Sequence, residues 1–524
     1  MTPVHCSTSK FPVVLLFVLI FTSGSQNCHG FRTFGFDIHH RFSDPVKGII
    51  PVDELPEKGS PDYYAALAHR DQIFRGRGLA DTGDEIFTFA GGNRTFRLAS
   101  LGFLHYANVS LGTPSLSFLV ALDTGSNLFW VPCDCTSCIQ GLKFSSGARL
   151  DFNIYSPNTS STSQKVPCNS SLCEQQRGCS TNPNSCPYQV QYLSNDTSSS
   201  GVLIQDVLHL RADNNHPEVI DAPITFGCGQ VQTGTFLDGA APNGLFGLGI
   251  DKVSVPSILA NRGLVADSFS MCFGPDGIGR ISFGDKGSPD QEETPFNLNQ
   301  LHPTYNISLT QIAVEKNVTD INFSAIFDSG TSFTYLNDPA YTLLAESFTS
   351  QAQDKRRPSD DSIPFEYCYD PSPNANSNVI PTINLTMQGG SQFSVYKPIM
   401  NISSQNESFY CLAVVKSSDV DIIGQNFMTG YRIVFDREKK VLGWKISHCY
   451  DIENSSTLAM PTGPAVGPGS YTPEATKTGN GSVISGAPPP SMSHVMRLTP
   501  FNYNLVMLTL PYLSIVLPFF LQAI

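Results

Sequence analysis

Two Asp-(Thr/Ser)-Gly triplets, each placed at the end of an apolar run, constrain the fold of this 524-residue chain more than any other feature. The run at residues 118–122 leads into the triplet that begins at Asp123, and the run at residues 324–327 leads into the triplet that begins at Asp328. A hydroxyl residue follows each triplet and aromatic residues come soon after, so each site reads as strand, tight turn and strand. The pattern predicts two related halves, each presenting one carboxylate on a turn.

Two carboxylates brought to one site suit a hydrolase that activates water. At a separation of about 3 Å the two groups cannot both ionise, so one keeps a proton while the other stays charged. The charged member can take a proton from a water molecule, and the protonated member can donate to a peptide carbonyl oxygen. We therefore predict that Asp123 and Asp328 are the catalytic pair. The residues expected to shape the turns and hold the carboxylates are Thr124, Gly125, Ser126, Ser329, Gly330 and Thr331.

Such triplets have other interpretations. A turn aspartate can simply bond its own backbone, but that role gives no reason for a second triplet in a matching context. The chain also holds a third triplet, Asp81-Thr82-Gly83, which has no strand pattern before it and no hydroxyl residue directly after it. We expect this third triplet to be a loop.

The charge balance argues against a nucleic-acid-binding protein. The 45 acidic residues outnumber the 32 Lys and Arg residues, which gives a formal net charge of −13 at pH 7 and a pI near 5.3. This balance predicts no nucleic-acid partner. It suits an acidic compartment, where carboxylates lose charge and self-repulsion falls.

The N-terminus carries a pattern typical of a secretory signal peptide. An apolar run from Phe11 to Phe21 follows Lys10, and small and polar residues come next, so we expect residues 1–30 to be removed. Cys6 and Cys28 fall in this segment, which leaves twelve of the 14 cysteines. An even number of cysteines on an oxidising route predicts disulfides.

The alternative for the cluster Cys133, Cys135 and Cys138 is a zinc site. No histidine accompanies these cysteines nearby, so we expect neither a metal nor a cofactor.

Thirteen Asn-x-Ser/Thr sequons indicate a glycoprotein. Asn108 and Asn306 lie in strand-like segments, where a glycan is harder to place. The candidates for glycosylation are Asn158, Asn169, Asn195, Asn317, Asn384, Asn401 and Asn454.

Residues 31–98 are interpreted as a propeptide, which would make the chain a zymogen. They mix basic and acidic residues with one helix-like stretch at residues 61–75. The alternative is an extra N-terminal domain, but the segment has little apolar content from which to build its own core.

From His105 onward the sequence predicts an all-β fold. Short β-branched and aromatic runs are separated by Gly, Pro, Asn and Ser, with one short helix expected at Pro339–Ser350. A charged linker, Asp285–Glu293, is expected to separate an N-terminal β lobe at residues 99–295 from a C-terminal β lobe at residues 296–450.

A later glycine repeats in the two halves. Leu245-Phe246-Gly247 follows the first triplet, and Ile422-Ile423-Gly424 follows the second. Strand, triplet and glycine in the same order predict an internal duplication.

The C-terminal region predicts a membrane anchor. Residues 451–485 are rich in Pro, Gly, Ser and Thr and are interpreted as a stalk. Residues 486–524 end in an apolar tail that contains two prolines, and small residues and a spacer precede it. This order is typical of a removed GPI-attachment signal, with Ser485 as the expected attachment site and Gly481 or Ser482 as alternatives. A single-pass transmembrane anchor is the other interpretation, because the tail is long enough to span a bilayer.

Several further segments resemble the pepsin-type aspartic proteases, and among them the plant nepenthesin-like branch. Residues 106–114 resemble the opening strand of that family, and residues 422–427 and 434–436 resemble its closing segments. Trp130 stands at the tryptophan that bonds the flap tyrosine, and Tyr192 at the flap tyrosine itself. The resemblance implies a two-lobed pepsin-like fold with the active site between the lobes. It also implies aspartic endopeptidase activity on protein or peptide substrates, and we expect a monomer.

The resemblance also implies disulfide pairings within the cysteine-rich insertion that runs from Cys133 to Cys186. The first two cysteines are one residue apart here, against two in the resembling enzymes, so their pairing stays open. The usual flap sequence is also replaced at residues 193–196, which contain a sequon at Asn195. The implied pairs are Cys168–Cys186, Cys173–Cys179, Cys138–Cys228, Cys272–Cys449 and Cys368–Cys411, which leaves Cys133 with Cys135.

Two functions fit these patterns. One is a secreted, GPI-anchored endopeptidase at the outer face of the plasma membrane. The other is a catalytically silent binding protein that keeps the fold, as in branch members whose triplets are damaged; here both triplets are intact.

Overall fold

The computed structural model describes most of the chain between residues 33 and 450. The described ranges are 33–49, 56–75, 86–88, 95–97, 102–143, 147, 149–173, 179, 183–192, 197–212, 219–237, 239–298, 304–372, 380–404, 407–418 and 420–450. The predicted signal peptide, stalk and C-terminal tail lie outside these residues, as do Asp81-Thr82-Gly83, Asn195, Asn454 and Ser485.

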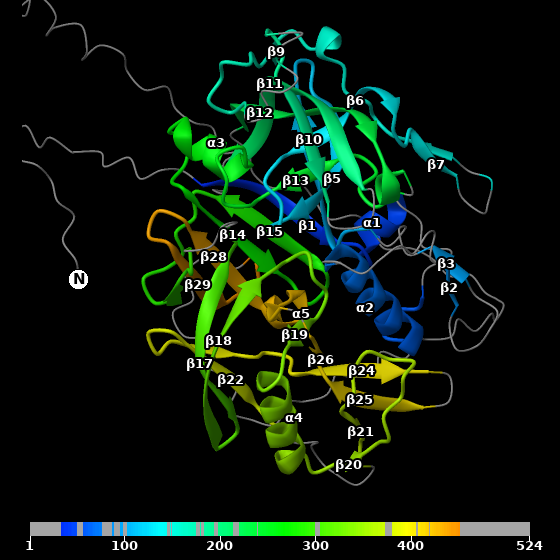
Figure 1. The fold of residues 1–524 in the computed structure, drawn as a ribbon, viewed down its shortest axis with the longest axis vertical. Coiled ribbons are helices and arrows are strands. Elements are labelled where there is room, and N and C mark those ends of the chain that lie inside the picture. The colour runs from blue at the N-terminus through cyan, green and yellow to red at the C-terminus, as the bar shows by residue number, and fades with distance from the viewer. Residues whose placement is uncertain are drawn as a thin grey trace, which may run out of the picture. The chain divides into compact units, whose positions relative to one another are not determined.

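A 14-stranded sheet forms the N-terminal lobe and continues into the C-terminal part of the chain (Figure 1). Apolar residues of its strands are buried in two core clusters, a large one and a smaller one that contains Trp130. The strands are β1 (Phe34–His40), β4 (His105–Leu111), β5 (Leu116–Asp123), β6 (Trp130–Ser137), β9 (Gln164–Lys165), β10 (Pro187–Gln191), β11 (Ser198–Ala212), β12 (Val219–Gln232), β13 (Leu245–Gly247), β14 (Ser268–Phe273), β15 (Ile278–Phe283), β16 (Glu292–Pro295), β28 (Tyr431–Asp436) and β29 (Val441–Ile446).

The C-terminal lobe is built on a seven-stranded sheet and a four-stranded sheet. The seven strands are β17 (Asn306–Val314), β18 (Asn317–Phe327), β19 (Thr334–Leu336), β22 (Ile383–Met387), β23 (Gln392–Ser394), β26 (Val414–Lys416) and β27 (Ile422–Ile423). The four strands are β20 (Lys355–Arg356), β21 (Cys368–Asp370), β24 (Ile399–Ser403) and β25 (Ser408–Leu412). Two two-stranded sheets pair β2 (Ile86–Thr88) with β3 (Thr95–Arg97), and β7 (Gly141–Lys143) with β8 (Arg149–Asp151).

Helices are few and short, as the sequence predicts. The α-helices are α1 (Asp44–Ile49), α2 (Pro61–Arg75), α3 (Val255–Asn261), α4 (Ala340–Gln351) and α5 (Gln425–Met428), with short 3-10 turns at Pro157–Thr159 and Gly234–Phe236. Helix α4 confirms the helix expected at Pro339–Ser350, shifted by one residue. The two-lobed all-β fold is confirmed. Within the described residues, no helix has the length and apolarity needed to cross a bilayer.

The predicted duplication is visible around the two triplets. Strand β13 runs parallel to β5, with Gly247 beside Asp123, and β27 runs parallel to the end of β18, with Ile423 beside Phe327. In each half a backbone N–H bonds across this contact: Leu248 donates to the Asp123 carbonyl, and Asp328 donates to the Ile423 carbonyl. The same local topology therefore holds both aspartates.

The expected charged linker at Asp285–Glu293 has no helix or strand from residue 285 to residue 291, but both of its ends are tied into the fold. Asp285 is buried, because it accepts a hydrogen bond from Ser270 and pairs with Arg432 of β28. Glu292 and Glu293 belong to β16, which pairs with β29. Backbone pairing joins β14 to β28, β28 to β29 and β29 to β16, so one sheet continues on both sides of this stretch.

Four of the expected disulfide pairings are also wrong. The structure joins Cys133 with Cys228, Cys135 with Cys138, Cys168 with Cys179 and Cys173 with Cys186. Cys133 and Cys228 lie on the neighbouring parallel strands β6 and β12, with Cα atoms 4.9 Å apart, which brings these two thiols together. The pairs Cys272–Cys449 and Cys368–Cys411 are confirmed.

The correct partners in the insertion depend on spatial proximity that the sequence does not reveal. Cys173 and Cys179 sulfurs lie 3.9 Å apart although each is bonded to another cysteine. All three thiols considered for zinc are in disulfides, so none is available as a thiolate ligand.

The N-terminal segment is an integral part of the fold. Strand β1 lies between β4 and β15, and it pairs with β15 from Phe34 to His39. Helix α2 lies between the lobes in the view of Figure 1, close to β19. These residues build no separate core, because Tyr63, Tyr64 and Leu67 are buried in the same cluster as Phe333 and Phe365 of the C-terminal lobe.

Candidate active site

The structure brings Asp123 and Asp328 to one place. Asp123 ends β5, and Asp328 directly follows β18. A Cβ atom built on Gly330 would lie 3.1 Å from Asp328 Oδ1 and 3.4 Å from Asp123 Oδ1. The two carboxylates therefore border the same point, and the absence of a side chain at Gly330 keeps that point open.

The two carboxylates interact electrostatically. Burial, and then the neighbouring charge of Asp328, raise the pKa of Asp123 from 3.8 to about 6, while Ser126, the Gly125 N–H and Arg70 act to lower it. Two close carboxylates share one proton because a like charge nearby disfavours ionisation of the second group. Below about pH 6 the pair can hold one proton, which provides one acid and one base.

The predicted hydroxyl and glycine residues hold this geometry. Gly125 N–H donates to Asp123 Oδ1 at 2.9 Å, and Gly330 N–H donates to Asp328 Oδ1 at 2.8 Å. Thr331 Oγ1 donates to Asp328 Oδ2 at 2.6 Å.

Thr124 and Ser329 link the two turns. Their hydroxyl oxygens lie 3.2 Å apart, and Ser329 N–H also donates to Thr124 Oγ1 at 3.3 Å. Both side chains are buried, so this link connects the two lobes directly beneath the carboxylates.

The residues matched to the flap also lie together. Trp130 Nε1 donates to the Tyr192 hydroxyl at 2.9 Å. Both rings pack edge-on against Phe236, with centroid distances of 4.9 and 5.0 Å. Tyr192 follows β10, the first strand of the hairpin with β11, and the proximity of Asp123 is among the causes that raise its pKa, after burial. The contact implied by the resemblance is therefore present.

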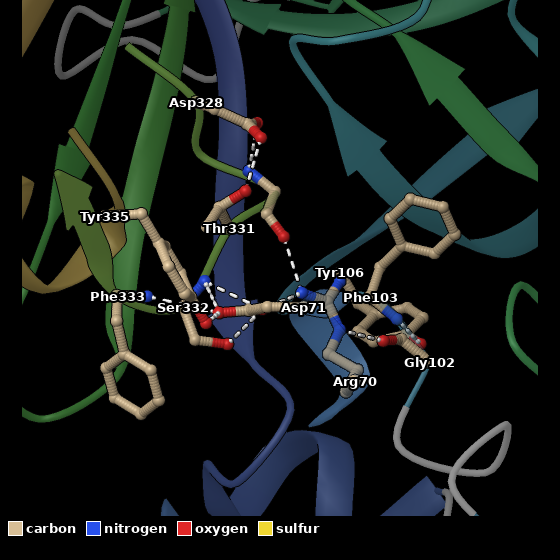
Figure 2. A network of polar contacts seen from close by, with 11 residues as sticks. Arg70, Asp71, Gly102, Phe103, Tyr106, Asp328, Thr331, Ser332, Phe333 and Tyr335 are labelled. Atoms are coloured by element: carbon tan, nitrogen blue, oxygen red, sulfur yellow. Dashed lines mark hydrogen bonds and ion pairs between the residues drawn. The ribbon is translucent and has the colours of Figure 1, made fainter. Parts of the chain in front are cut away.

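Sequence reasoning missed two residues of the site, Arg70 and Asp71 of helix α2. Figure 2 shows the Arg70 guanidinium reaching the backbone of the second triplet. Arg70 donates to the Gly330 carbonyl at 2.6 Å and to the Gly102 carbonyl at 2.7 Å, and it pairs with Asp71 at 2.8 Å. The hydrogen bond to Gly330 places helix α2 beside the second triplet, and the charge of Arg70 acts to lower the pKa of Asp123.

Asp71 lies in a cradle of hydrogen-bond donors just beyond the second triplet. Ser332 N–H contacts both carboxylate oxygens at 3.0 Å, and Ser332 Oγ donates at 2.7 Å. Tyr335 Oη donates at 3.0 Å, and Phe333 N–H lies at 3.4 Å (Figure 2). We call these donors the Asp71 cradle. No periodicity or motif in residues 61–75 marks a buried Arg-Asp pair, because its burial depends on the distant loop at 330–335.

The sequence comparisons agree with this geometry. Residues 105–285 match the family described as Xylanase inhibitor N-terminal, and residues 304–445 match the one described as Xylanase inhibitor C-terminal. The Arabidopsis thaliana protein named Aspartyl protease family protein 1 is 59% identical over 452 residues, which cover 86% of this chain and 88% of that protein. The chain belongs to the plant aspartic protease family. Another member of this aspartic protease family, nepenthesin-2 of Nepenthes gracilis, is 28% identical over 68% of this chain and 76% of its own length.

Solved structures show the same fold. Basic 7S globulin from soybean matches with a TM-score of 0.51 at 21% identity, over 66% of this chain and 93% of that one. Conglutin gamma from lupine seeds matches with a TM-score of 0.50 at 20% identity, over 65% of this chain and 90% of that one. The aspartic protease fold of this chain is thus also the fold of two seed globulins.

The predicted glycosylation sites differ in accessibility. Asn158, Asn169, Asn317 and Asn401 are exposed, and Asn384 is half-buried on β22, where it accepts a hydrogen bond from Ser394. Asn306 is buried and bonds Asn297, which opposes a glycan there, whereas Asn108 is exposed. Use of any site stays a prediction.

Proposed function

We propose that this chain is the precursor of an aspartic endopeptidase that hydrolyses peptide bonds at acidic pH. The main support is that the carboxylates of Asp123 and Asp328 border a common point, where burial and then the charge of Asp328 raise the pKa of Asp123 to about 6. The cysteine-rich insertion from Cys133 to Cys186 supports placing the chain in the nepenthesin-like branch.

The proposed reaction uses the shared proton. A water molecule between the carboxylates gives a proton to the charged carboxylate as its oxygen attacks the peptide carbonyl carbon. The protonated carboxyl donates to the carbonyl oxygen, and the resulting tetrahedral intermediate collapses when the amine leaves with a proton. The link between Thr124 and Ser329 fixes the distance between the carboxylates through both steps. Tyr192, held by Trp130, closes over the substrate and excludes bulk water.

The contacts of helix α2 support the interpretation of residues 31–98 as an inhibitory propeptide. Arg70 donates a hydrogen bond to the Gly330 carbonyl beside the two aspartates, and the helix buries Tyr63 and Tyr64 against the C-terminal lobe. A peptide could not reach Gly330 while the helix stays docked. Activity therefore requires residues 61–75 to leave.

Digestion of casein or denatured haemoglobin at pH 4 tests the proposal. We expect cleavage that a transition-state-mimicking inhibitor of aspartic proteases blocks. A binding protein without catalysis is the second candidate, supported by the match to families described as xylanase inhibitors. Absence of cleavage after removal of residues 31–98, with the fold retained, would favour that second candidate.

We further propose that the protein is secreted, acts as a monomer and is held at the outer face of the plasma membrane by a GPI anchor at Ser485. The support is the sequence order of stalk, small residues, spacer and apolar tail. Phosphatidylinositol-specific phospholipase C is expected to release the protein from intact cells. Retention on the membrane, with Phe519 and Phe520 still present in the mature chain, would show a transmembrane anchor instead.

A further inference from the structure

We propose that the Asp71 cradle is a carboxylate-binding subsite of the catalytic cleft, and that a substrate with an acidic side chain occupies it once residues 61–75 leave. The inference rests on the proposed endopeptidase function, and it names the class of substrate that the C-terminal lobe would prefer. Asp71 is, in this view, the tethered occupant of a site that later holds part of the substrate.

The cradle is built for two carboxylate oxygens. Ser332 N–H lies 3.0 Å from each oxygen, Ser332 Oγ contacts Oδ1 at 2.7 Å, and Tyr335 Oη contacts Oδ2 at 3.0 Å. Phe333 N–H lies 3.4 Å from Oδ2. The backbone groups can only donate, so they match an acceptor on both sides. An amide side chain would turn its own NH2 toward one of these donors.

The cradle lies within reach of the reacting atoms. Ser332 follows the triplet that carries Asp328, and Thr331 between them bonds the Asp328 carboxylate. Arg70, the neighbour of Asp71 in sequence, reaches the Gly330 carbonyl. Arg70 and Asp71 are adjacent in sequence, and together they reach from the triplet to the cradle. Two neighbouring side chains of a bound peptide span a similar distance.

Departure of the helix leaves the cradle without its acceptor. Asp71 is fully buried, and so are Ser332 and Tyr335 beneath it. A buried donor that loses its acceptor is costly unless water or a ligand replaces it. Arg70 departs with Asp71, so the cradle keeps neutral donors from the loop at 332–335 and the Gly330 carbonyl regains a place for a peptide N–H. A peptide with an acidic side chain supplies both partners.

The first test needs no catalysis. Asp71→Ala in the full chain at pH 7 removes a group the size of formate. We expect faster hydrogen exchange at the amides of Ser332 and Phe333, and restored protection when formate is added. Formamide is the neutral control. Equal effects of formate and formamide, or no effect of either, would overturn the proposal whether or not the protein is a protease.

The second test uses the processed enzyme and paired fluorogenic peptides that carry Asp or Asn at each position around the cleaved bond. We expect about a tenfold higher kcat/KM for Asp at one position, the scale of one lost charged hydrogen bond. Tyr335→Phe should bring the kcat/KM values for the Asp and Asn peptides closer together. The matched control Tyr410→Phe removes a hydroxyl that bonds Asp354, outside the cradle, and should keep the preference.

The outcomes separate the subsite from the activity. Cleavage without an Asp preference at any position would overturn the subsite and leave the proposed function standing. Loss of all activity would overturn the function, and formate rescue would still decide the cradle. Full activity with residues 61–75 intact and the Ser332 amide still protected would show that Asp71 is a permanent support of the loop, which also overturns the subsite.

Discussion

A pair of buried histidines predicts how acid releases the N-terminal segment. His40 of β1 pairs in register with His105 of β4, and their ring centroids lie 5.2 Å apart. Both side chains are almost fully buried, and Phe42 N–H donates to His40 Nδ1, which requires a neutral ring nitrogen there. The pair therefore joins the N-terminal segment to the lobe only while it stays uncharged.

All of the charged neighbours that shift the pKa of either histidine are cationic. Burial, followed by His105, Lys58, Arg70 and Arg41, lowers the pKa of His40 well below 6.5. Burial, followed by Arg70 and His39, lowers the pKa of His105 to about 3. An imidazolium at either position would meet these cations in a buried site.

The sign of the pH effect follows from these shifts. The docked pKa values lie below those of exposed histidines, so docking is unaffected above about pH 6.5 and weakens as the pH falls below it. Near pH 4.5 each histidine opposes docking by roughly 1–3 kcal/mol. Asp71 cannot supply this effect, because burial raises its pKa and acid therefore does not oppose its docking.

Substitution of one histidine should move release to lower pH. With two titrating groups the docking free energy falls by about 2.7 kcal/mol per pH unit, and with one it falls by half of that. In His40→Gln the midpoint of release should therefore lie about twice as far below pH 6.5 as in the parent. The assay is hydrogen exchange of residues 34–40 between pH 7 and 3, in a chain that carries Asp328→Asn so that it cannot cut itself.

His448→Gln is the matched control, because His448 is exposed beyond β29. It should leave the midpoint of release unchanged. A release midpoint in both His40→Gln and His105→Gln that equals that of the control would show that the histidine pair does not control release.

Three further predictions concern the site and the fold. Asp123→Asn should abolish proteolysis, and it should raise the free energy of unfolding by about 1–3 kcal/mol at pH 7 but not at pH 4. The reason is that the stability linked to the raised pKa of Asp123 is lost as the pH rises through about 6. Urea unfolding at both pH values checks this. Tyr192→Ala should lower kcat far more than it lowers the thermal midpoint, and a wild-type kinetic profile would remove Tyr192 from the site. Asp285→Ala should destabilise the protein by about 3 kcal/mol, because it removes the buried carboxylate that pairs with Arg432 of β28; a loss under 1 kcal/mol would show that this ion pair contributes little to the sheet.

The parts of the fold that follow local rules could be predicted from the sequence. The apolar runs before Asp123 and Asp328 form β5 and β18, and Gly247 and Gly424 follow each as expected. A Cβ atom at Gly424 would lie 2.1 Å from the Phe333 carbonyl oxygen, which explains a glycine there in physical terms. Helix α2 was also predictable, because its residues favour a helix without any partner.

The features that depend on distant contacts could not be predicted. The burial of Asp285 needs Arg432, which lies 147 residues away in the chain. The Arg70–Asp71 pair needs the loop at 330–335, more than 250 residues away. Partner choice among the cysteines of the insertion likewise depends on which strands pair, and spacing does not encode it.

Casein cleavage by variants of the Asp123–Asp328 pair tests the catalytic role of the two carboxylates directly. Wild-type protein, Asp328→Asn and the control Asp81→Asn would be processed identically by an added protease that removes residues 31–98, and then assayed for casein cleavage at pH 4. We predict cleavage by wild type and Asp81→Asn, and at least a thousandfold loss in Asp328→Asn with an unchanged fold, about the scale of removing one member of a catalytic pair. Cleavage by Asp328→Asn within tenfold of wild type would contradict the assignment of the dyad.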